Sequence, residues 1–119
     1  MPEPRTFTGG CHCGLVRYEC TTDLAMVTNC NCSICTKKGL HLAFVEPQKF
    51  RLAAGEESLK EYRFNRHVIA HQMCSDCGVE SFAYGQKPDG TKVVAVHVST
   101  FDGIDLATVT MTPFDGKKL

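Results

Sequence analysis

The sequence predicts a mainly β protein built around bound metal, and two observations support that prediction. Turn-forming glycines, prolines and aspartates recur along the 119 residues and leave short apolar intervals, which suits strands better than long helices. Seven of the eight cysteines fall into three tight clusters, which is typical of tetrahedral metal sites. We therefore expect antiparallel sheets with at most short helical turns.

The predicted strands follow one another through most of the chain. In residues 15–20 the residues alternate, so Val16, Tyr18 and Cys20 share one face of a strand. The unbroken apolar run 93–96 indicates a strand in the middle of a sheet. The other predicted strands are residues 42–45, 50–53, 59–64, 68–73 and 79–84, and the run 93–96 belongs to one over residues 92–98.

Two local signals interrupt the strands. The segment Lys87-Pro88-Asp89-Gly90 has the composition of a hairpin turn between the last two strands. The single helical turn that we expect covers residues 33–38, and Gly39 ends it as a C-cap.

Size and charge argue for a single domain and against a generally basic protein. The length suits a single domain over residues 1–119. Thirteen basic and thirteen acidic residues cancel, which argues against a general binder of nucleic acid or anionic membranes. Neither a signal peptide nor a bilayer-spanning stretch is visible, so we expect a cytoplasmic protein. Clustered cysteines there bind metals more often than they form disulfides, which remain the alternative.

The three cysteine clusters have the spacings of zinc ligands. In the C-x-x-C cluster, the two intervening residues form a knuckle that brings both sulfurs to one side. In each C-x-C, residues i and i+2 share a face of an extended chain, and a local bend can bring them to one ion. The clusters are an N-terminal pair (Cys11 and Cys13), a triplet (Cys30, Cys32 and Cys35) and a C-terminal pair (Cys74 and Cys77).

Compactness predicts how the sulfurs divide between two zinc ions. The triplet lies within six residues and can face one ion alone, with one position left open for chemistry or ligand binding. The two pairs then form a closed four-cysteine site with a structural role. We call these the open cluster and the closed cluster. A competing division joins Cys30 and Cys32 to the C-terminal pair and leaves Cys11, Cys13 and Cys35 scattered.

A fourth protein ligand would close the open cluster as well. Cys20 is one candidate, although its alternation with Val16 and Tyr18 indicates a buried strand face. His41 follows the triplet by six residues and is the first histidine to consider. The remaining histidines are His12, His67, His71 and His97.

In this pattern the chain resembles the glutathione-dependent formaldehyde-activating (GFA) family, whose domain centromere protein V also carries. The resemblance implies a β-tent, two layers of antiparallel sheet held by a structural zinc at the closed cluster, with substrate approaching the open cluster. It also implies synthesis of S-(hydroxymethyl)glutathione, a carbon–sulfur lyase activity. The resemblance covers roughly residues 7 to 105 and rests on Gly9-Gly10-Cys11-His12-Cys13-Gly14, on the triplet followed by Lys37, Lys38 and Gly39, and on Cys74-Ser75-Asp76-Cys77-Gly78.

The resulting hypothesis requires two zinc ions per chain and glutathione as co-substrate. Cys30, Cys32 and Cys35 are the predicted catalytic residues, because the zinc that they hold would deprotonate a thiol. The thiolate then adds to formaldehyde or another small aldehyde. Lys37 and Lys38 are predicted to attract the carboxylates of glutathione, unless they only favour a helix C-terminus. A small thiol and a small aldehyde are the expected partners, without nucleic acid or membrane.

Three other functions remain open from the sequence. The domain could carry glutathione or another thiol without catalysis, or sense zinc or oxidants through the open cluster. A purely structural zinc module is the third alternative, which the neutral composition disfavours. Four residues are candidates for lining a pocket, although the sequence does not place them: Tyr62, Arg63, Arg66 and Tyr84.

Overall fold

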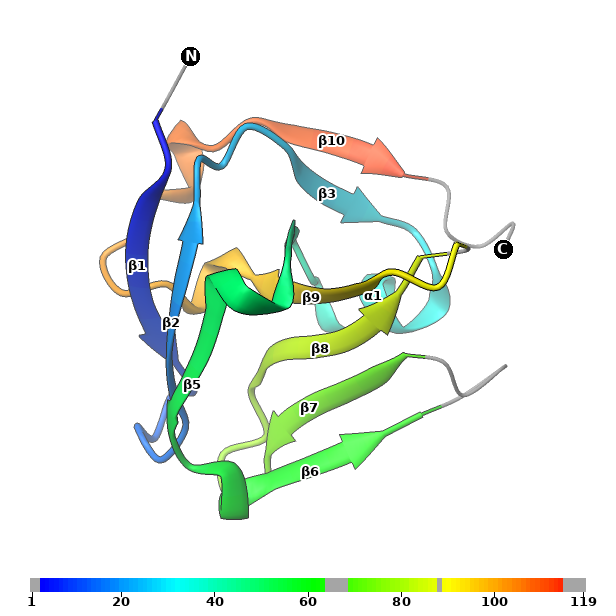
Figure 1. Ribbon diagram of the computed structural model, residues 1–119. Coiled ribbons are helices and arrows are strands. Elements are labelled where there is room, and N and C mark those ends of the chain that lie inside the picture. Colours follow the sequence, from blue (N-terminus) through cyan, green and yellow to red (C-terminus); the bar gives the residue numbers. More distant parts are fainter. Residues whose placement is uncertain (1–2, 64–68, 88, 115–119) are drawn as a thin grey trace.

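Two β-sheets form the protein in the computed structural model, which describes residues 3–63, 69–87 and 89–114 (Figure 1). The small sheet has the strand order β1-β2-β5, and the large sheet has the order β10-β3-β4-β9-β8-β7-β6. The strands are β1 (Arg5–Gly10), β2 (Arg17–Thr22), β3 (Val27–Cys30), β4 (Leu42–Val45), β5 (Phe50–Ala54), β6 (Leu59–Tyr62), β7 (Ala70–Cys74), β8 (Glu80–Gln86), β9 (Lys92–His97) and β10 (Met111–Phe114). The helices are α1 (Ser33–Lys38) and the 3-10 turns η1 (Pro47–Lys49), η2 (Glu56–Ser58), η3 (Val98–Thr100) and η4 (Leu106–Thr108).

The expected mainly β fold is confirmed. Within the described ranges the strand pairs are antiparallel, apart from β10, which runs parallel to β3. The small sheet stands on the left in Figure 1 and faces the large sheet. None of the helices in the described part of the chain is long and apolar enough to cross a membrane.

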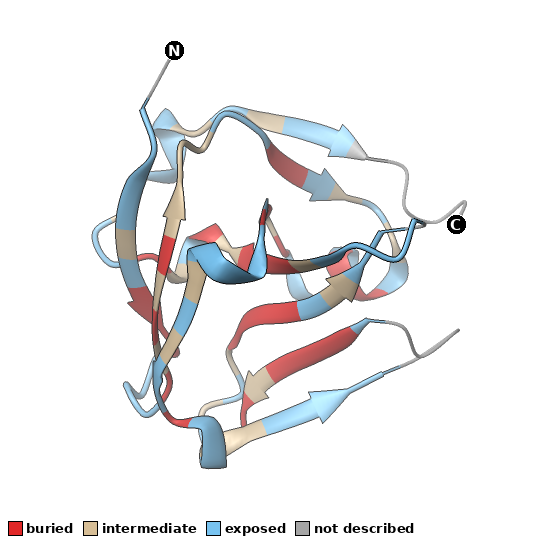
Figure 2. Ribbon diagram, in the orientation of Figure 1, coloured by how far each residue is buried: buried red, intermediate tan, exposed pale blue. Residues whose placement is uncertain are grey.

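The main core lies between the two sheets. Tyr18 on β2 is 1% exposed, and its ring lies 5.4 Å from that of Phe50 and 6.4 Å from that of Phe82. Val16 and Cys20 are buried beside it, as the alternation of residues 15–20 predicts. Figure 2 shows buried residues along β7, β8 and β9 as well, and four of them belong to this core: Cys74, Phe82, Val94 and Val96. Apolar contact between the sheets is therefore the main source of their association.

The helix α1 packs on the other face of the large sheet. Its buried residues Ile34 and Cys35 contact Ala83 and Ala95, which alternate along β8 and β9 with core residues. The predicted helical turn 33–38 is confirmed, and Gly39 ends it in the left-handed conformation (φ 66°). The apolar run on β9 is buried on both faces, because the core covers one and α1 the other.

The structure also departs from the predicted elements. Residues 15 and 16 belong to a turn, so β2 begins at Arg17. Residues 64 and 68, at the ends of two predicted strands, lie outside the described residues, as does Pro88 of the predicted hairpin turn. The remainder of that turn joins β8 to β9 as expected, and Lys87 N donates to Thr91 O at 2.8 Å. Three strands were not expected from the sequence: β1, β3 and β10.

Candidate metal centres

The closed cluster forms where two hairpin tips meet. Cys11 and Cys13 lie in the turn between β1 and β2, whereas Cys74 ends β7 and Cys77 lies in the turn that follows it. The sulfurs of Cys11 and Cys13 are 3.5 Å apart, and those of Cys13 and Cys74 are 3.6 Å apart. All four sulfurs lie within 4.8 Å of one another. A Zn–S bond of about 2.3 Å separates the corners of a tetrahedron by about 3.8 Å, so these four sulfurs could hold a zinc ion.

Backbone N–H groups point at these sulfurs. The N–H of Val16 donates to Cys11 Sγ at 3.3 Å, and the N–H groups of Asp76 and Cys77 donate to Cys74 Sγ at 3.3 and 3.4 Å. The pKa of the Cys77 thiol is lowered to about 6, chiefly by the hydrogen bond from the N–H of Val79. Such donors stabilise sulfur in its thiolate form, which is the form that binds metal. The surroundings therefore suit a bound cation.

The open cluster lies at the junction of β3 and α1. Cys30 ends the strand, Cys32 is the N-cap of the helix, and Cys35 lies inside it with 4% exposure. Their three sulfurs also lie within 4.8 Å of one another, and the N–H of Cys32 donates to Cys30 Sγ at 3.4 Å. Cys30 and Cys32 are half-buried, which leaves this set of sulfurs accessible from one side. These three cysteines could also hold a metal ion.

The candidate fourth ligands lie elsewhere. Among the described residues, no further cysteine, histidine or carboxylate has a ligand atom within 4.8 Å of all three sulfurs of the open cluster. Cys20 is buried in the main core, where burial raises the pKa of its thiol to about 11. His41 and His97 lie beside each other, and the N–H of His41 donates to His97 Nδ1 at 3.2 Å. His12 is exposed and belongs to neither cluster, and His67 lies outside the described residues.

A cleft of about 640 Å³ opens beside the open cluster. Cys30 and Cys35 lie on its wall, and Pro113 contributes from β10, which pairs in parallel with β3 at Asn29. Among the described residues, the side chains that line this cleft carry no cation. The other lining residues are Asn29, Asn31, Thr36 and Gly39. A molecule bound here would therefore meet amide and hydroxyl groups next to the sulfurs.

The two lysines after the triplet have different surroundings. Lys37 is exposed at the C-terminal end of α1. Lys38 instead reaches across to the large sheet, where its Nζ lies 3.0 Å from Glu80 Oε1. Neither lysine lines the cleft beside the open cluster. Because a carboxylate already neutralises Lys38, Lys37 is the better placed of the two to meet a second anion.

Glu80 is the buried centre of a polar network that sequence reasoning missed. Its side chain is 1% exposed, and its second oxygen lies 2.8 Å from His71 Nδ1. His71 is also buried, and Lys38 is 29% exposed. We call Lys38, Glu80 and His71 the Glu80 network. A buried carboxylate is stable only with such partners, so the network fastens the end of α1 to β7 and β8.

Comparison with known proteins agrees with the motifs. Residues 6–114 match the family described as glutathione-dependent formaldehyde-activating enzyme. The crystal structure of a Rhodobacter sphaeroides protein superposes with a TM-score of 0.75 at 28% sequence identity, and the match covers 88% of this chain and 99% of that chain. Because the family match spans nearly the whole sequence and both cysteine clusters, the chain belongs to the glutathione-dependent formaldehyde-activating family.

Proposed function

We propose that the chain is a zinc-dependent carbon–sulfur lyase of the S-(hydroxymethyl)glutathione synthase type. It joins the thiol of glutathione, or a similar small thiol, to formaldehyde or another small aldehyde, and it acts as one domain in the cytoplasm. One observation carries the proposal: among the described residues, four sulfurs converge at one place and three at the other. Family membership supports the type of reaction.

Each cluster has its own task in this proposal. The four thiolates of the closed cluster hold a structural zinc that joins the two hairpin tips. Cys30, Cys32 and Cys35 hold a second zinc. When bound, this zinc would supply a free coordination position at which a thiol loses its proton near neutral pH. The N–H of Cys32 donates to Cys30 Sγ and orients that sulfur, and the burial of Cys35 holds its sulfur between α1 and the large sheet.

The reaction needs no redox partner. A bond forms between the thiol sulfur and the aldehyde carbon, and the electron pair of the C=O double bond passes to oxygen. That oxygen then takes up a proton from solvent, which balances the proton lost by the thiol. Asn29, Asn31 and Thr36 line the cleft where this oxygen develops, and their amide and hydroxyl groups stabilise it by hydrogen bonds.

The two lysines after the triplet have different tasks: Lys37 binds the substrate, and Lys38 positions α1. Lys37 attracts a carboxylate of the thiol substrate from the exposed end of α1. Lys38, whose charge is already paired with Glu80, acts by holding α1 on the sheet. Screening by solvent limits the attraction at Lys37 to a modest effect on KM.

Metal stoichiometry tests the division of sulfurs. We expect two zinc ions per purified chain and one in the Cys35→Ser variant, with the β-sheet circular dichroism unchanged. Cys20→Ser is the matched control, because Cys20 lies in the core away from both clusters and should leave two ions bound. A Cys35→Ser variant that unfolds or keeps both ions would contradict the division.

The activity needs a separate measurement, because glutathione and formaldehyde also combine without a catalyst. Exchange NMR at equilibrium reports the rate of adduct formation with and without protein. We expect acceleration by the wild type and none by Cys32→Ser, and calorimetry reports thiol binding independently. Binding without acceleration would show a thiol carrier instead of an enzyme.

A further inference from the structure

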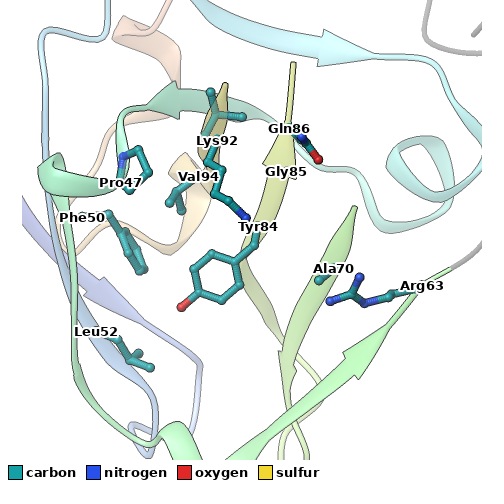
Figure 3. A pocket seen from close by; sticks show the side chains of 11 residues that line it. Pro47, Phe50, Leu52, Arg63, Ala70, Tyr84, Gly85, Gln86, Lys92 and Val94 are labelled. Atoms are coloured by element: carbon teal, nitrogen blue, oxygen red, sulfur yellow. The ribbon is translucent and has the colours of Figure 1, made fainter. Parts of the chain in front are cut away.

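A second cleft lies between the two sheets, away from the open cluster. Its volume is about 620 Å³, within the range of small-molecule sites. Phe50 and Leu52 line it from β5, and Tyr84 and Val94 line it from β8 and β9 (Figure 3). It shares no lining residue with the cleft at the open cluster, and α1 packs on the opposite face of the large sheet. The two clefts are therefore separate.

Part of the wall of this inter-sheet cleft is aromatic and apolar, beside the polar side chains of Arg63, Gln86 and Lys92. The rings of Phe50 and Phe82 lie 4.7 Å apart, and Tyr84 packs edge-on against Phe82 at 5.2 Å. Tyr84 is nevertheless 41% exposed, so part of its ring faces the open space. Val94 and Ala70, both 2% exposed, form the floor. An apolar ligand bound in this cleft would cover the part of the Tyr84 ring that the fold leaves exposed to water.

The charged side chains that line the cleft are all positive. Figure 3 shows Arg63 and Lys92 on two sides of the Tyr84 ring, and the described lining residues include no carboxylate. Arg63 donates through Nε to Glu61 at 2.8 Å, whereas Lys92 has no ion pair within the described ranges. Lys92 is therefore the principal cation available to an anion in this cleft.

An acidic region borders the cleft on its far side. Glu56 and Glu57 line the adjoining groove, which shares Leu52 and Tyr84 with the cleft. Burial raises the pKa of Tyr84, and the charge of Glu56 raises it further, so its hydroxyl stays a donor at neutral pH. A second negative charge on a ligand would meet these glutamates. The cleft therefore favours a ligand with a single negative group, which lies near Lys92, and with no charge on the rest of the molecule.

We propose that this inter-sheet cleft is a second ligand site, which binds a small organic monocarboxylate. The apolar or aromatic body of the ligand packs on Phe50 and Tyr84, and its carboxylate pairs with Lys92, assisted by Arg63. The site is independent of the metal clusters and of the proposed lyase reaction. It adds a binding function at a cleft whose described lining residues include no cysteine.

Phenylacetate is a suitable probe, because it combines an aromatic ring with one carboxylate. We expect an NMR titration of the zinc-loaded full chain to shift the amides of Leu52, Tyr84 and Val94 and to leave residues 30–39 unchanged. Phenethylamine, with the opposite charge, should bind much more weakly. The variant Lys92→Met should weaken phenylacetate binding about fivefold, as expected for a partly exposed ion pair.

Two further variants make the test specific. Lys60→Met removes an exposed lysine on β6 outside the cleft and should leave binding unchanged. Tyr84→Leu keeps an apolar side chain but removes the aromatic face, and should weaken binding at least as much as Lys92→Met. The proposal is overturned by the absence of shifts at about 20 mM phenylacetate, a concentration that reveals even weak sites. Equal binding of phenethylamine, or shifts confined to residues 30–39, would overturn it as well.

Discussion

Replacement of Glu80 by glutamine should lower the free energy of unfolding by about 2 kcal/mol. Removing one partner of a buried ion pair typically costs about 3–5 kcal/mol, because the other charge remains buried. Two features reduce the cost here: Lys38 is 29% exposed, so water can solvate part of its charge, and glutamine keeps one acceptor oxygen. The expected loss is therefore about half of the fully buried value.

Urea unfolding of the zinc-loaded protein measures this loss directly. Lys38→Met and the Lys38→Met/Glu80→Gln double variant complete a cycle, in which we expect a coupling of about 1 kcal/mol. Glu19→Gln is the matched control, since Glu19 pairs with Arg51 at the surface and its loss should cost under about 0.5 kcal/mol. The network also orders α1, so a chelator should remove one zinc faster from Glu80→Gln than from the wild type.

Two results would refute this reasoning. A Glu80→Gln protein as stable as the Glu19→Gln control would show that the buried carboxylate carries no net charge–charge stabilisation. A coupling near zero in the cycle would show that Lys38 and Glu80 contribute independently. In either case the link between α1 and the sheet would have to come from the apolar contacts of Ile34 and Cys35 alone.

Three shorter predictions concern single residues elsewhere. Gly9→Ala should lower the free energy of unfolding by at least about 2 kcal/mol in urea, because its new Cβ would clash with the backbone oxygen of Thr100. Gly85→Ala, whose nearest atom lies at 3.6 Å, should cost much less, and equal losses would contradict the steric explanation. Burial lowers the pKa of His97 in the folded state, so below about pH 6.5 the unfolded chain binds a proton that the folded chain does not, and stability should fall as pH falls. The slope should be smaller in His97→Gln, and an unchanged slope would assign the effect to other groups. Cys20→Ala should cost about 1 kcal/mol and keep the full zinc content, and the loss of an ion would instead make Cys20 a ligand.

The features that could be predicted from sequence are those encoded over a few residues. The alternation of Val16, Tyr18 and Cys20 identified a face that is fully buried. Gly39 marked the end of α1, because only a residue tolerant of positive φ fits there. The structure also brings together the same three and the same four cysteines that their spacing had grouped, since C-x-C and C-x-x-C segments fix the local direction of the sulfurs.

The features that were missed depend on contacts distant in sequence. In a regular strand, Glu80 would lie on the same face as Phe82 and point into the main core. The pairing of β7 with β8 is irregular, however, because the register shifts between Gln72 and Met73. This bulge lets Glu80 contact His71 and Lys38 on the face of the large sheet that α1 covers. The strand β10 has few local strand signals and is defined by its parallel pairing with β3, more than 80 residues earlier.

The long separation within the closed cluster matters during protein synthesis. A ribosome releases the chain from its N-terminus, so Cys11, Cys13 and the triplet emerge well before Cys74 and Cys77. During that interval Cys11 and Cys13 lack the second pair of the closed cluster, and an ion bridging them to the triplet would be a kinetic trap. The missing pair arrives only when the β7–β8 hairpin is complete, so an ion that binds earlier would meet an unfinished site.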